Sequence, residues 1–516
     1  MSELPTIFES PSKGLLLESL GADNNTILPQ GPVCGMELSM HGKIEKGDEA
    51  SVVTDYTDAD DSDAMSCARS DSDIEENARD LSSGFLFRKS DLKVSSESAT
   101  LLINEQSKFK EANGETVYKF GFGQSPFMPP DFVMDEFAER VSHKEYSEVA
   151  GLPMLREKVA QFHNHYDKLD IDPKNVVVGS GSKILIYAIL SSFRMANVFI
   201  ITPSWVSYEP QADLARLNTV RVDTCYEEGW RLTPARLHDA LSVYSSTADP
   251  SICIFNYPGN PDGLTYSGDE LHALAKVFRE HNVLVISDEI YGLLHHTGEH
   301  ISVAQYYPEG TIVCSGISKW CGAGGWRLGV SLFPSSLQNT LKPVVVGILS
   351  ETISCVASPV QYAAAKAYTL CQEIDTYLHH QRRILASAGR MFYERLTAVG
   401  VQMHMPTAGF YCYLDFSPLA AALSEKRRVT TSYDLCEDLL SRACIAVLPG
   451  TAFGAPAGLL SARLAYVDFN GRNALAASYE TPLSESLDEA FLMAHCPKLV
   501  DGCKKIAQYC TELADK

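Results

Sequence analysis

The stretch TIVCSGISKWCGAGGWRLG, residues 311–329, joins a short β-branched run to a segment rich in glycine. Lys319 stands near its middle, and Arg327 follows eight residues later. Glycine costs roughly 1 kcal/mol in the interior of a helix or a strand, so packing alone does not favour such a segment. The stretch therefore predicts a strand that leads into a functional loop.

Similar apolar runs precede this stretch along the chain. They are Asn175–Val178, Val198–Thr202, Ile252–Phe255 and Val283–Ser287, and amphipathic segments such as Leu271–His281 separate them. Continuous apolar strands that alternate with helices are typical of a parallel sheet buried on both faces. We expect an α/β domain in the middle of the chain.

The pattern changes after about Ala386. Gly409–Phe416 and Ala443–Leu448 have the composition of strands among amphipathic helices, and Ser484–Tyr509 predicts one or two terminal helices. We found no internal repeat, which argues against a solenoid. A second, smaller α+β domain is the expected arrangement, and a chain of 516 residues is long enough for both domains.

The N-terminal region is strongly acidic. Between Asp48 and Glu76 the only basic residue is Arg69, and aromatic residues are rare, which predicts a disordered arm. The alternative is a regulatory arm phosphorylated at Ser70 or Ser72. The formal net charge of −22 argues against nucleic acid and anionic membranes as partners, because both bind basic surfaces.

Cysteine usage and the N-terminus indicate a cellular location. The 14 cysteines form no Cys-x-x-Cys pair and do not lie near histidines at zinc-ligand spacing, so we expect reduced thiols and no metal. The first residues lack the basic and apolar pattern of a signal or transit peptide. No apolar run is long enough to span a bilayer. These features predict a cytoplasmic protein.

Turn-forming and charged residues follow the predicted strands repeatedly. GSGSK (179–183), NYPGNPDG (256–263) and DEIYG (288–292) each come directly after an apolar run. Ligands of open α/β sheets bind beyond the carboxyl ends of the strands. Small residues before a helix let backbone amides approach a phosphate, although an ordinary βα loop uses them too. Asp288 would need a cation or a hydrogen-bond donor if it is buried.

These motifs, together with residues 315–329, resemble the signature of class I/II aminotransferases, which are pyridoxal-phosphate enzymes of fold type I. Five further elements fit the resemblance in the same order: FGFGQ (120–124), Tyr146 before GLPMLRE, TPSWVSYEP (202–210), VLPGTAFG (447–454) and ARLAYVDF (462–469). The resemblance runs from about Tyr118 to the C-terminal region.

The resemblance implies a large α/β/α domain around a mostly parallel seven-stranded sheet and a smaller α+β domain. We expect four segments: an acidic, largely disordered extension (1–95), the N-terminal part of the small domain with a linker (96–145), the large cofactor-binding domain (146–385) and the C-terminal small domain (386–516).

The resemblance also implies the roles of the catalytic residues. Lys319 should form the Schiff base with pyridoxal phosphate and carry the proton between the substrate Cα and the cofactor. Asp288 should pair with the protonated pyridine nitrogen, and Tyr291 and Asn260 should donate to the ring oxygen. The alternative for Tyr291 and Asn260 is a purely structural role in their turns.

The remaining cofactor contacts follow from the same resemblance. The phosphate should meet Arg327 and the turn of Gly181, Ser182 and Lys183. Family members often have a serine three residues before the lysine, where this chain has Gly316, so Ser315 or Ser318 should replace that contact. Trp205 should stack on the pyridine ring, with a core residue as the alternative.

Two expectations concern the substrate and a second subunit. Arg463 should bind the substrate α-carboxylate, with the region of Gly123 beside it and with Asn260 and Trp205 completing the substrate contacts. Tyr146 should reach the cofactor phosphate of a neighbouring subunit, which implies a homodimer with shared active sites.

The predicted function is transfer of an amino group from an L-amino acid to a 2-oxo acid by a ping-pong mechanism. A lyase acting on carbon–sulfur bonds, or a synthase on the same fold, is the alternative within enzymes. A catalytically dead scaffold protein is a further alternative, although no expected catalytic residue is missing. Aspartate-specific relatives of one subgroup carry, in the stretch that corresponds to residues 349–359, an arginine for the distal carboxylate of the substrate. This chain has no basic residue there, which weakly disfavours that mode of dicarboxylate recognition.

Overall fold

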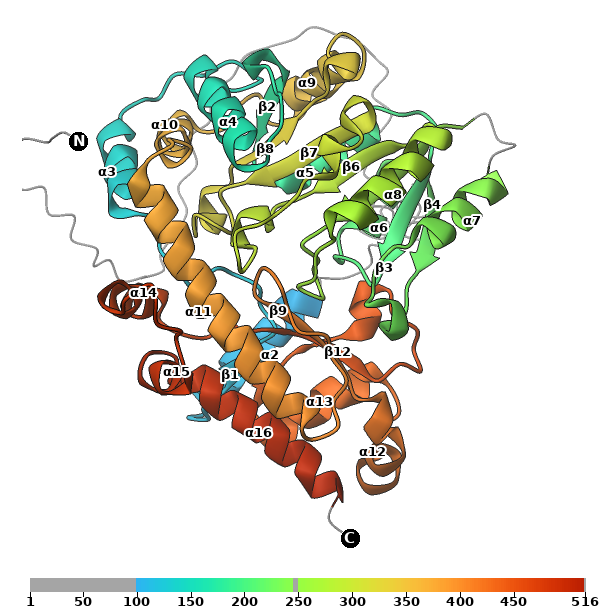
Figure 1. Cartoon of the computed structure of the whole chain (residues 1–516), viewed down its shortest axis with the longest axis vertical. Coiled ribbons are helices and arrows are strands. Elements are labelled where there is room, and N and C mark those ends of the chain that lie inside the picture. The colour runs from blue at the N-terminus through green and yellow to red at the C-terminus, as the bar shows by residue number, and fades with distance from the viewer. Residues whose placement is uncertain (1–98, 245–248, 515–516) are drawn as a thin grey trace, which may run out of the picture. The chain divides into compact units, whose positions relative to one another are not determined.

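A seven-stranded sheet organises the middle of the chain in the computed structural model, which describes residues 99–244 and 249–514 (Figure 1). The strand order is β2-β8-β7-β6-β5-β3-β4, and only β8 runs antiparallel to its neighbours. The strands are β2 (Val176–Gly179), β3 (Asn197–Thr202), β4 (Asn218–Asp223), β5 (Ser251–Asn256), β6 (Leu284–Asp288), β7 (Thr311–Gly316) and β8 (Gly329–Leu332). The predicted mostly parallel sheet is confirmed.

Helices cover both faces of this sheet because successive side chains of each buried strand point to opposite sides. Ile200, Ile254 and Ile286 face a core that includes α5 (Ser182–Ser191), α6 (Tyr208–Leu214) and α9 (Leu341–Thr352). Phe199, Cys253 and Val285 face a second core with α7 (Pro234–Tyr244) and α8 (Gly268–Glu280). At the β2 and β8 end, α4 (Pro153–Tyr166) and α10 (Ser358–Ala367) pack on Val176 and Val330.

A second group of strands forms the smaller part of the fold. β11 (Leu448–Pro449), β12 (Ser461–Ala465) and β9 (Tyr411–Asp415) make an antiparallel sheet, and β1 (Tyr118–Lys119) pairs with β10 (Ile445–Ala446) in parallel. The remaining helices are α2 (Ala99–Ala112), α3 (Asp131–Arg140), α11 (Gln372–Thr397), α12 (Ala420–Arg427), α13 (Ser432–Ala443), α14 (Gly471–Glu480), α15 (Glu489–His495) and α16 (Pro497–Ala514). The two predicted terminal helices are α15 and α16.

Helix α11 connects the two parts of the fold. It runs without a break from beside α10 toward α13 and α16 (Figure 1). The predicted boundary between residues 385 and 386 falls within this helix, and the described residues belong to one compact unit. The division into segments 96–145, 146–385 and 386–516 therefore stays a prediction.

Strand register brings the sequence motifs together at the carboxyl ends of the parallel strands, which form one edge of the sheet. Asn256 at the end of β5 lies beside Asp288 at the end of β6, and Asp288 lies beside Cys314 in β7. Gly329 of β8 lies between Gly316 of β7 and Gly179 of β2. The loops after β2, β5, β6 and β7 consequently leave the sheet at the same edge.

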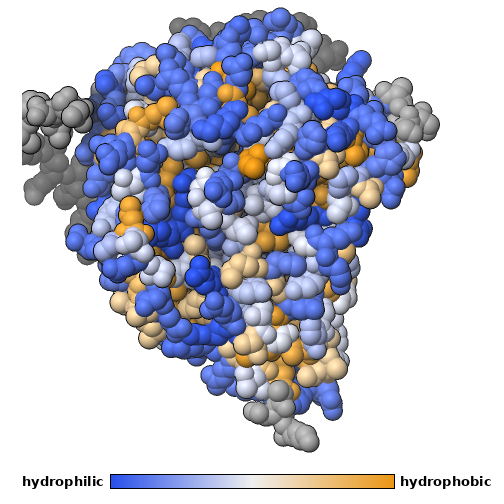
Figure 2. Space-filling model, viewed as in Figure 1, coloured by the Kyte–Doolittle hydropathy of each residue, from blue (hydrophilic) through white to orange (hydrophobic). Residues whose placement is uncertain are grey.

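The acidic stretch from Asp48 to Glu76, with Ser70 and Ser72, lies outside the described residues, as does the whole predicted extension 1–95. All twelve cysteines within the described residues are free thiols. Across residues 99–244 and 249–514, no helix has both the length and the apolar character needed to span a bilayer. The face shown in Figure 2 is largely hydrophilic, with hydrophobic side chains scattered across it.

Candidate active site

A cavity of about 540 Å³ opens at this edge of the sheet, between the strand ends and the smaller part of the fold. Its size is within the range of small-molecule and cofactor sites. The wall contains most of the residues that the sequence predicted: Gly123, Ser182, Lys183, Trp205, Asn260, Asp288, Tyr291, Ser318, Lys319, Arg327 and Arg463. Two predicted residues, Gly181 and Tyr146, do not line it.

One end of the cavity is built to receive an anion. Gly181 precedes the first turn of α5 with φ +87°, a backbone conformation that favours glycine. A Cβ at Gly181 would lie 2.3 Å from Nη2 of Arg327, so the missing side chain makes room for the guanidinium. Arg327 donates to the carbonyl of Gly324 at 2.9 Å. A positive helix N-terminus and an arginine fork therefore meet at one point.

Lys183 adds a second cation at this end. Its Nζ lies 4.8 Å from the centre of the Trp205 ring. Partial burial in the cavity wall, followed by the charges of Arg327 and Lys319, lowers the pKa of Lys183. The presence of Lys183, Arg327 and Lys319 in one cavity wall indicates a site that binds negative charge.

Asp288 contributes a buried acidic group to the wall of the same cavity. Its carboxylate is buried, accepts from the hydroxyl of Tyr208 at 2.6 Å and lies near the amide of Ile290 at 3.3 Å. Burial raises the pKa of Asp288 to about 6, although the Tyr208 hydrogen bond and the charge of Lys319 oppose the rise. A buried carboxylate in this state favours a cationic ligand, since a cation would restore the interactions lost on leaving water.

Lys319 lies between these two ends. Its Nζ donates to the carbonyl of Gly123 at 2.8 Å and lies 5.5 Å and 5.7 Å from the ring centres of Tyr291 and Phe410. The lysine follows β7, and the loop then turns at Gly322, which has φ +70°. A Cβ at Gly322 would lie 2.1 Å from the carbonyl of Phe127, so glycine is required there.

Arg463 occupies a buried position that no carboxylate among the described residues neutralises. The guanidinium donates to Oδ1 of Asn260 at 3.0 Å and to the carbonyl of Gly121 at 2.6 Å. It lies 4.7 Å from the ring centre of Tyr411 and 4.9 Å from that of Phe453, and its Nε has no hydrogen-bond partner within residues 99–244 and 249–514. Burial lowers the pKa of Arg463. An unpaired buried cation favours an anionic ligand.

Gly316 explains why the usual serine is missing. It ends β7, and a Cβ there would lie 2.8 Å from the carbonyl of Leu328 and 2.9 Å from Cα of Gly329. A serine would therefore require a shift of β8. Ser318 lines the cavity, whereas the buried Ser315 does not. The geometry favours Ser318 as the hydroxyl that replaces the missing contact.

Sequence reasoning missed two tyrosines in the cavity wall. Tyr208 is the partner of Asp288, and the hydroxyl of Tyr411 lies 2.9 Å from that of Tyr291. Tyr411 also explains Gly123, because a Cβ there would lie 1.9 Å from the tyrosine hydroxyl. Tyr208 lies within the TPSWVSYEP motif and Tyr411 within the strand of residues 409–416, so their positions were visible but their contacts were not.

A cluster of metal-binding side chains lies away from the cavity. His238 of α7 and His281, with Glu280 at the end of α8, bring one ligand atom each to within 4.8 Å of one another. The two rings already bond to each other through Nδ1 and Nε2, which are 3.1 Å apart. Since this hydrogen bond accounts for the arrangement, we assign no metal to it.

Comparisons with known proteins agree with this site. The family model for aminotransferase class I and II matches residues 115–467, a range that contains all the predicted site residues. The aspartate aminotransferase of Geobacillus stearothermophilus is 32% identical over 368 residues, which cover 70% of this chain and 90% of that protein. The aspartate/prephenate aminotransferase of Thermus thermophilus is 28% identical over 365 residues, covering 69% of this chain and 89% of that protein.

Solved structures give the same result. The aspartate aminotransferase from Thermus thermophilus with maleate matches with a TM-score of 0.67 and 25% identity, over 80% of this chain and 97% of that chain. The aromatic aminotransferase from Pyrococcus horikoshii matches with a TM-score of 0.64 and 26% identity, over 79% of this chain and 99% of that chain. The chain belongs to the aminotransferase class I and II family, and its activity class is that of an aminotransferase.

Proposed function

We propose that this aminotransferase depends on pyridoxal phosphate and moves an amino group from an L-amino acid to a 2-oxo acid in two half-reactions at Lys319. One observation carries the proposal. The lysine amine lies in the same cavity as a buried carboxylate, Asp288, and an anion-binding end formed by Arg327 and the start of α5.

The residues present fit this cofactor. The space kept open by Gly181 beside Arg327 suits a phosphate, and the raised pKa of Asp288 indicates a carboxylate that a cationic ring nitrogen would stabilise. Bound pyridoxal phosphate supplies an aldehyde that condenses with amines and a ring that withdraws electrons from the substrate Cα. Trp205, beside Lys183, would cover the ring, and Ser318 would add a hydroxyl near the phosphate.

Lys319 would hold and move the proton. As a free amine, Nζ of Lys319 would take the proton from the substrate Cα and hold it for its return. The aromatic rings of Tyr291 and Phe410 limit water around Nζ. Tyr291 and Asn260 would donate to the ring oxygen, and the contact between Tyr291 and Tyr411 fixes the direction of the first hydroxyl.

Arg463 would orient the substrate. Its buried, unpaired guanidinium can form a bidentate pair with the α-carboxylate of an amino acid, with Gly123 beside it. Asn260 already holds one arm of Arg463 in place. A substrate held in this way would lie in the same cavity as Lys319, whose side chain also lines it.

A second subunit is part of the proposal. Tyr146 is 89% exposed and lies outside the cavity wall of its own chain, as expected of a residue that reaches a neighbouring site. Val141 is 68% exposed nearby in the sequence. We infer a homodimer with shared active sites and a cytoplasmic location, both of which rest on the sequence expectations and on the family.

The test is an assay with purified protein, added pyridoxal phosphate, 2-oxoglutarate and a panel of amino acids. Aspartate and aromatic amino acids come first because relatives are named for them. Formation of glutamate and of the matching keto acid, both dependent on 2-oxoglutarate, is the expected result. Pyruvate and ammonia released without a keto-acid acceptor would identify a lyase instead and contradict the proposal.

A further inference from the structure

The residue after Asp288 is a second buried acid, Glu289, which has no role in the proposed reaction. Asp288 ends β6 and Glu289 follows it, with exposed fractions of 3% and 4%. Because successive side chains of a strand alternate, Asp288 faces the cavity and Glu289 points to the other side, as Ser287 does. A buried acid is costly unless donors surround it.

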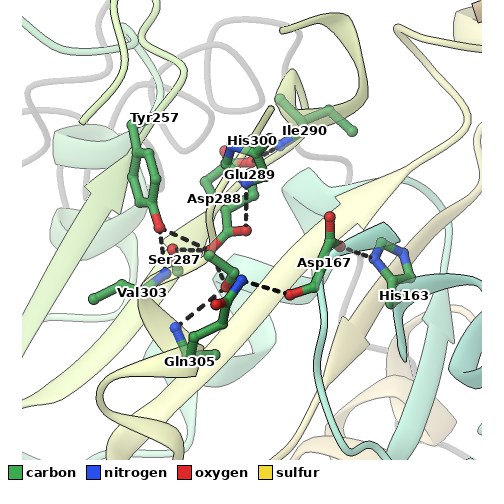
Figure 3. A network of polar contacts seen from close by, with 12 residues as sticks. His163, Asp167, Tyr257, Ser287, Asp288, Glu289, Ile290, His300, Val303 and Gln305 are labelled. Atoms are coloured by element: carbon green, nitrogen blue, oxygen red, sulfur yellow. Dashed lines mark hydrogen bonds and ion pairs between the residues drawn. The ribbon is translucent and has the colours of Figure 1, made fainter. Parts of the chain in front are cut away.

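Hydrogen-bonding groups contact both carboxylate oxygens of Glu289 (Figure 3). Its Oε1 accepts from the hydroxyls of Ser287 at 2.6 Å, Ser302 at 2.8 Å and Tyr257 at 3.3 Å, and its Oε2 lies 2.8 Å from Nε2 of His300. Tyr257 itself accepts from the amide of Val303. Both oxygens of the Glu289 carboxyl group therefore have hydrogen-bonding partners.

His300 can supply an opposing charge when its ring is protonated. Burial, the largest single effect, lowers the pKa of His300, but the hydrogen bond and charge of Glu289 and the charge of Asp167 together raise it above its usual value. The other groups that act on His300 are Arg382 of α11 and the neighbouring His295. The ring fits only because residue 292 is glycine, since a Cβ there would lie 2.7 Å from the His300 ring.

The pair also ties down the backbone of the catalytic turn. The amide of Glu289 donates to the carbonyl of Cys314 at 2.9 Å, and its carbonyl accepts from the amide of Gly292 at 2.8 Å. The turn between these bonds carries Asp288 on one side and Tyr291 on the other. The side chain of Glu289 joins this turn to the segment 300–302, which lies outside the cavity wall.

We propose that Glu289 and His300 are positioning residues, a buried carboxylate–imidazole pair that fixes the turn from Asp288 to Tyr291 and balances the charge next to Asp288. The inference rests on the proposed function, because Asp288 and Tyr291 are its cofactor contacts. Glu289 raises the pKa of Asp288, so its neutralisation by His300 keeps Asp288 ionised for the ring nitrogen.

The experiment measures the dissociation constant of pyridoxal phosphate by quenching of tryptophan fluorescence in the cofactor-free protein, where Trp205 lines the cavity. Glu289→Gln and His300→Ala should each weaken binding about tenfold, as loss of groups that orient ligands does at other sites. The double variant should bind about as weakly as either single variant, because both remove the same interaction. Asp415→Asn, which replaces another buried carboxylate at the end of β9, should leave binding unchanged.

The pH dependence of cofactor binding distinguishes a positioning role of Glu289 and His300 from a general loss of structure in the variants. Affinity should fall as Asp288 becomes protonated, and the midpoint of that fall reports its charge environment. Tyr208 and Lys319, which also act on Asp288, are untouched in these variants. Glu289→Gln removes a negative neighbour and should move the midpoint to lower pH, whereas His300→Ala leaves Glu289 unbalanced and should move it to higher pH.

Three outcomes would overturn the inference: unaltered affinity in Glu289→Gln and His300→Ala, an equal loss in Asp415→Asn, or midpoints that move in the same direction. Ser302→Ala removes a single donor and replaces Glu289→Gln if that variant does not fold, with a smaller loss of affinity expected. Failure of the unaltered protein to bind pyridoxal phosphate would instead contradict the proposed function.

Discussion

The substitution Asp288→Asn tests how much the burial of this carboxylate destabilises the cofactor-free protein. In the cofactor-free protein, burial raises the pKa of Asp288 from 3.8 to about 6. The folded-state pKa of Asp288 therefore lies above its unfolded value. The stability that the protonated Asp288 contributes is complete below pH 3.8 and is lost as the pH rises through about 6. Asparagine carries no charge over this pH range, so the stability of the variant should not fall for this reason.

The size of the effect follows from the same values. The difference between a pKa of 3.8 and one of about 6 corresponds to about 3 kcal/mol at pH 8. The asparagine oxygen can still accept from Tyr208, but the contact with the amide of Ile290 at 3.3 Å is lost, which costs about 1 kcal/mol. The cofactor-free variant should be more stable than the unaltered protein by about 2 kcal/mol at pH 8 and by about 0.5 kcal/mol at pH 5.

The assay is urea denaturation of both cofactor-free proteins at pH 5 and pH 8. Other titrating groups are shared, so they cancel in the difference between the two proteins. Addition of pyridoxal phosphate should then stabilise the unaltered protein more than the variant, because the variant binds it more weakly. A variant that is less stable at pH 8, or a stability difference that is equal at both pH values, would refute this reasoning.

Three further substitutions test the anion-binding end of the cavity and the proposed substrate contact. Arg327→Ala should weaken binding of pyridoxal phosphate about 10- to 100-fold and leave pyridoxal, which lacks the phosphate, unaffected in equilibrium dialysis; equal losses for both would argue against a phosphate contact. Gly181→Ala should lower the free energy of unfolding by about 1–3 kcal/mol in a denaturation experiment, because φ is +87° and its Cβ would lie 2.3 Å from Arg327; an unchanged value would contradict the strain. Arg463→Lys should lower kcat/KM for amino donors about 100-fold without changing cofactor affinity, since a point charge replaces a bidentate fork; unaltered kcat/KM would remove Arg463 from the substrate site.

The strands that the sequence predicted correctly are those buried on both faces. Val198–Thr202 and Ile252–Phe255 are continuous apolar runs, and they became β3 and β5. β4 escaped notice because it is an edge strand of sequence NTVRVD with exposed and half-buried residues. β8 was missed because its sequence, GVSL, contains a glycine and a serine and so has no continuous apolar run.

The site followed a similar rule. Residues at or shortly after the carboxyl ends of strands, such as Asp288 and Asn260, could be predicted because parallel strands bring these ends together. Tyr208 and Tyr411 could not, since they meet Asp288 and Tyr291 across 80 and 120 residues of sequence. Glu289 looks like an ordinary surface acid until the hydroxyls of the surrounding segments are seen around it.

The central claim is that Lys319 binds the cofactor covalently. Borohydride reduction of the protein after incubation with pyridoxal phosphate, followed by peptide mass spectrometry, tests it most directly, because reduction fixes the bond between the lysine and the cofactor. The account predicts one modified peptide, which contains Lys319. Modification of Lys183 in place of Lys319, or of neither lysine, would contradict it.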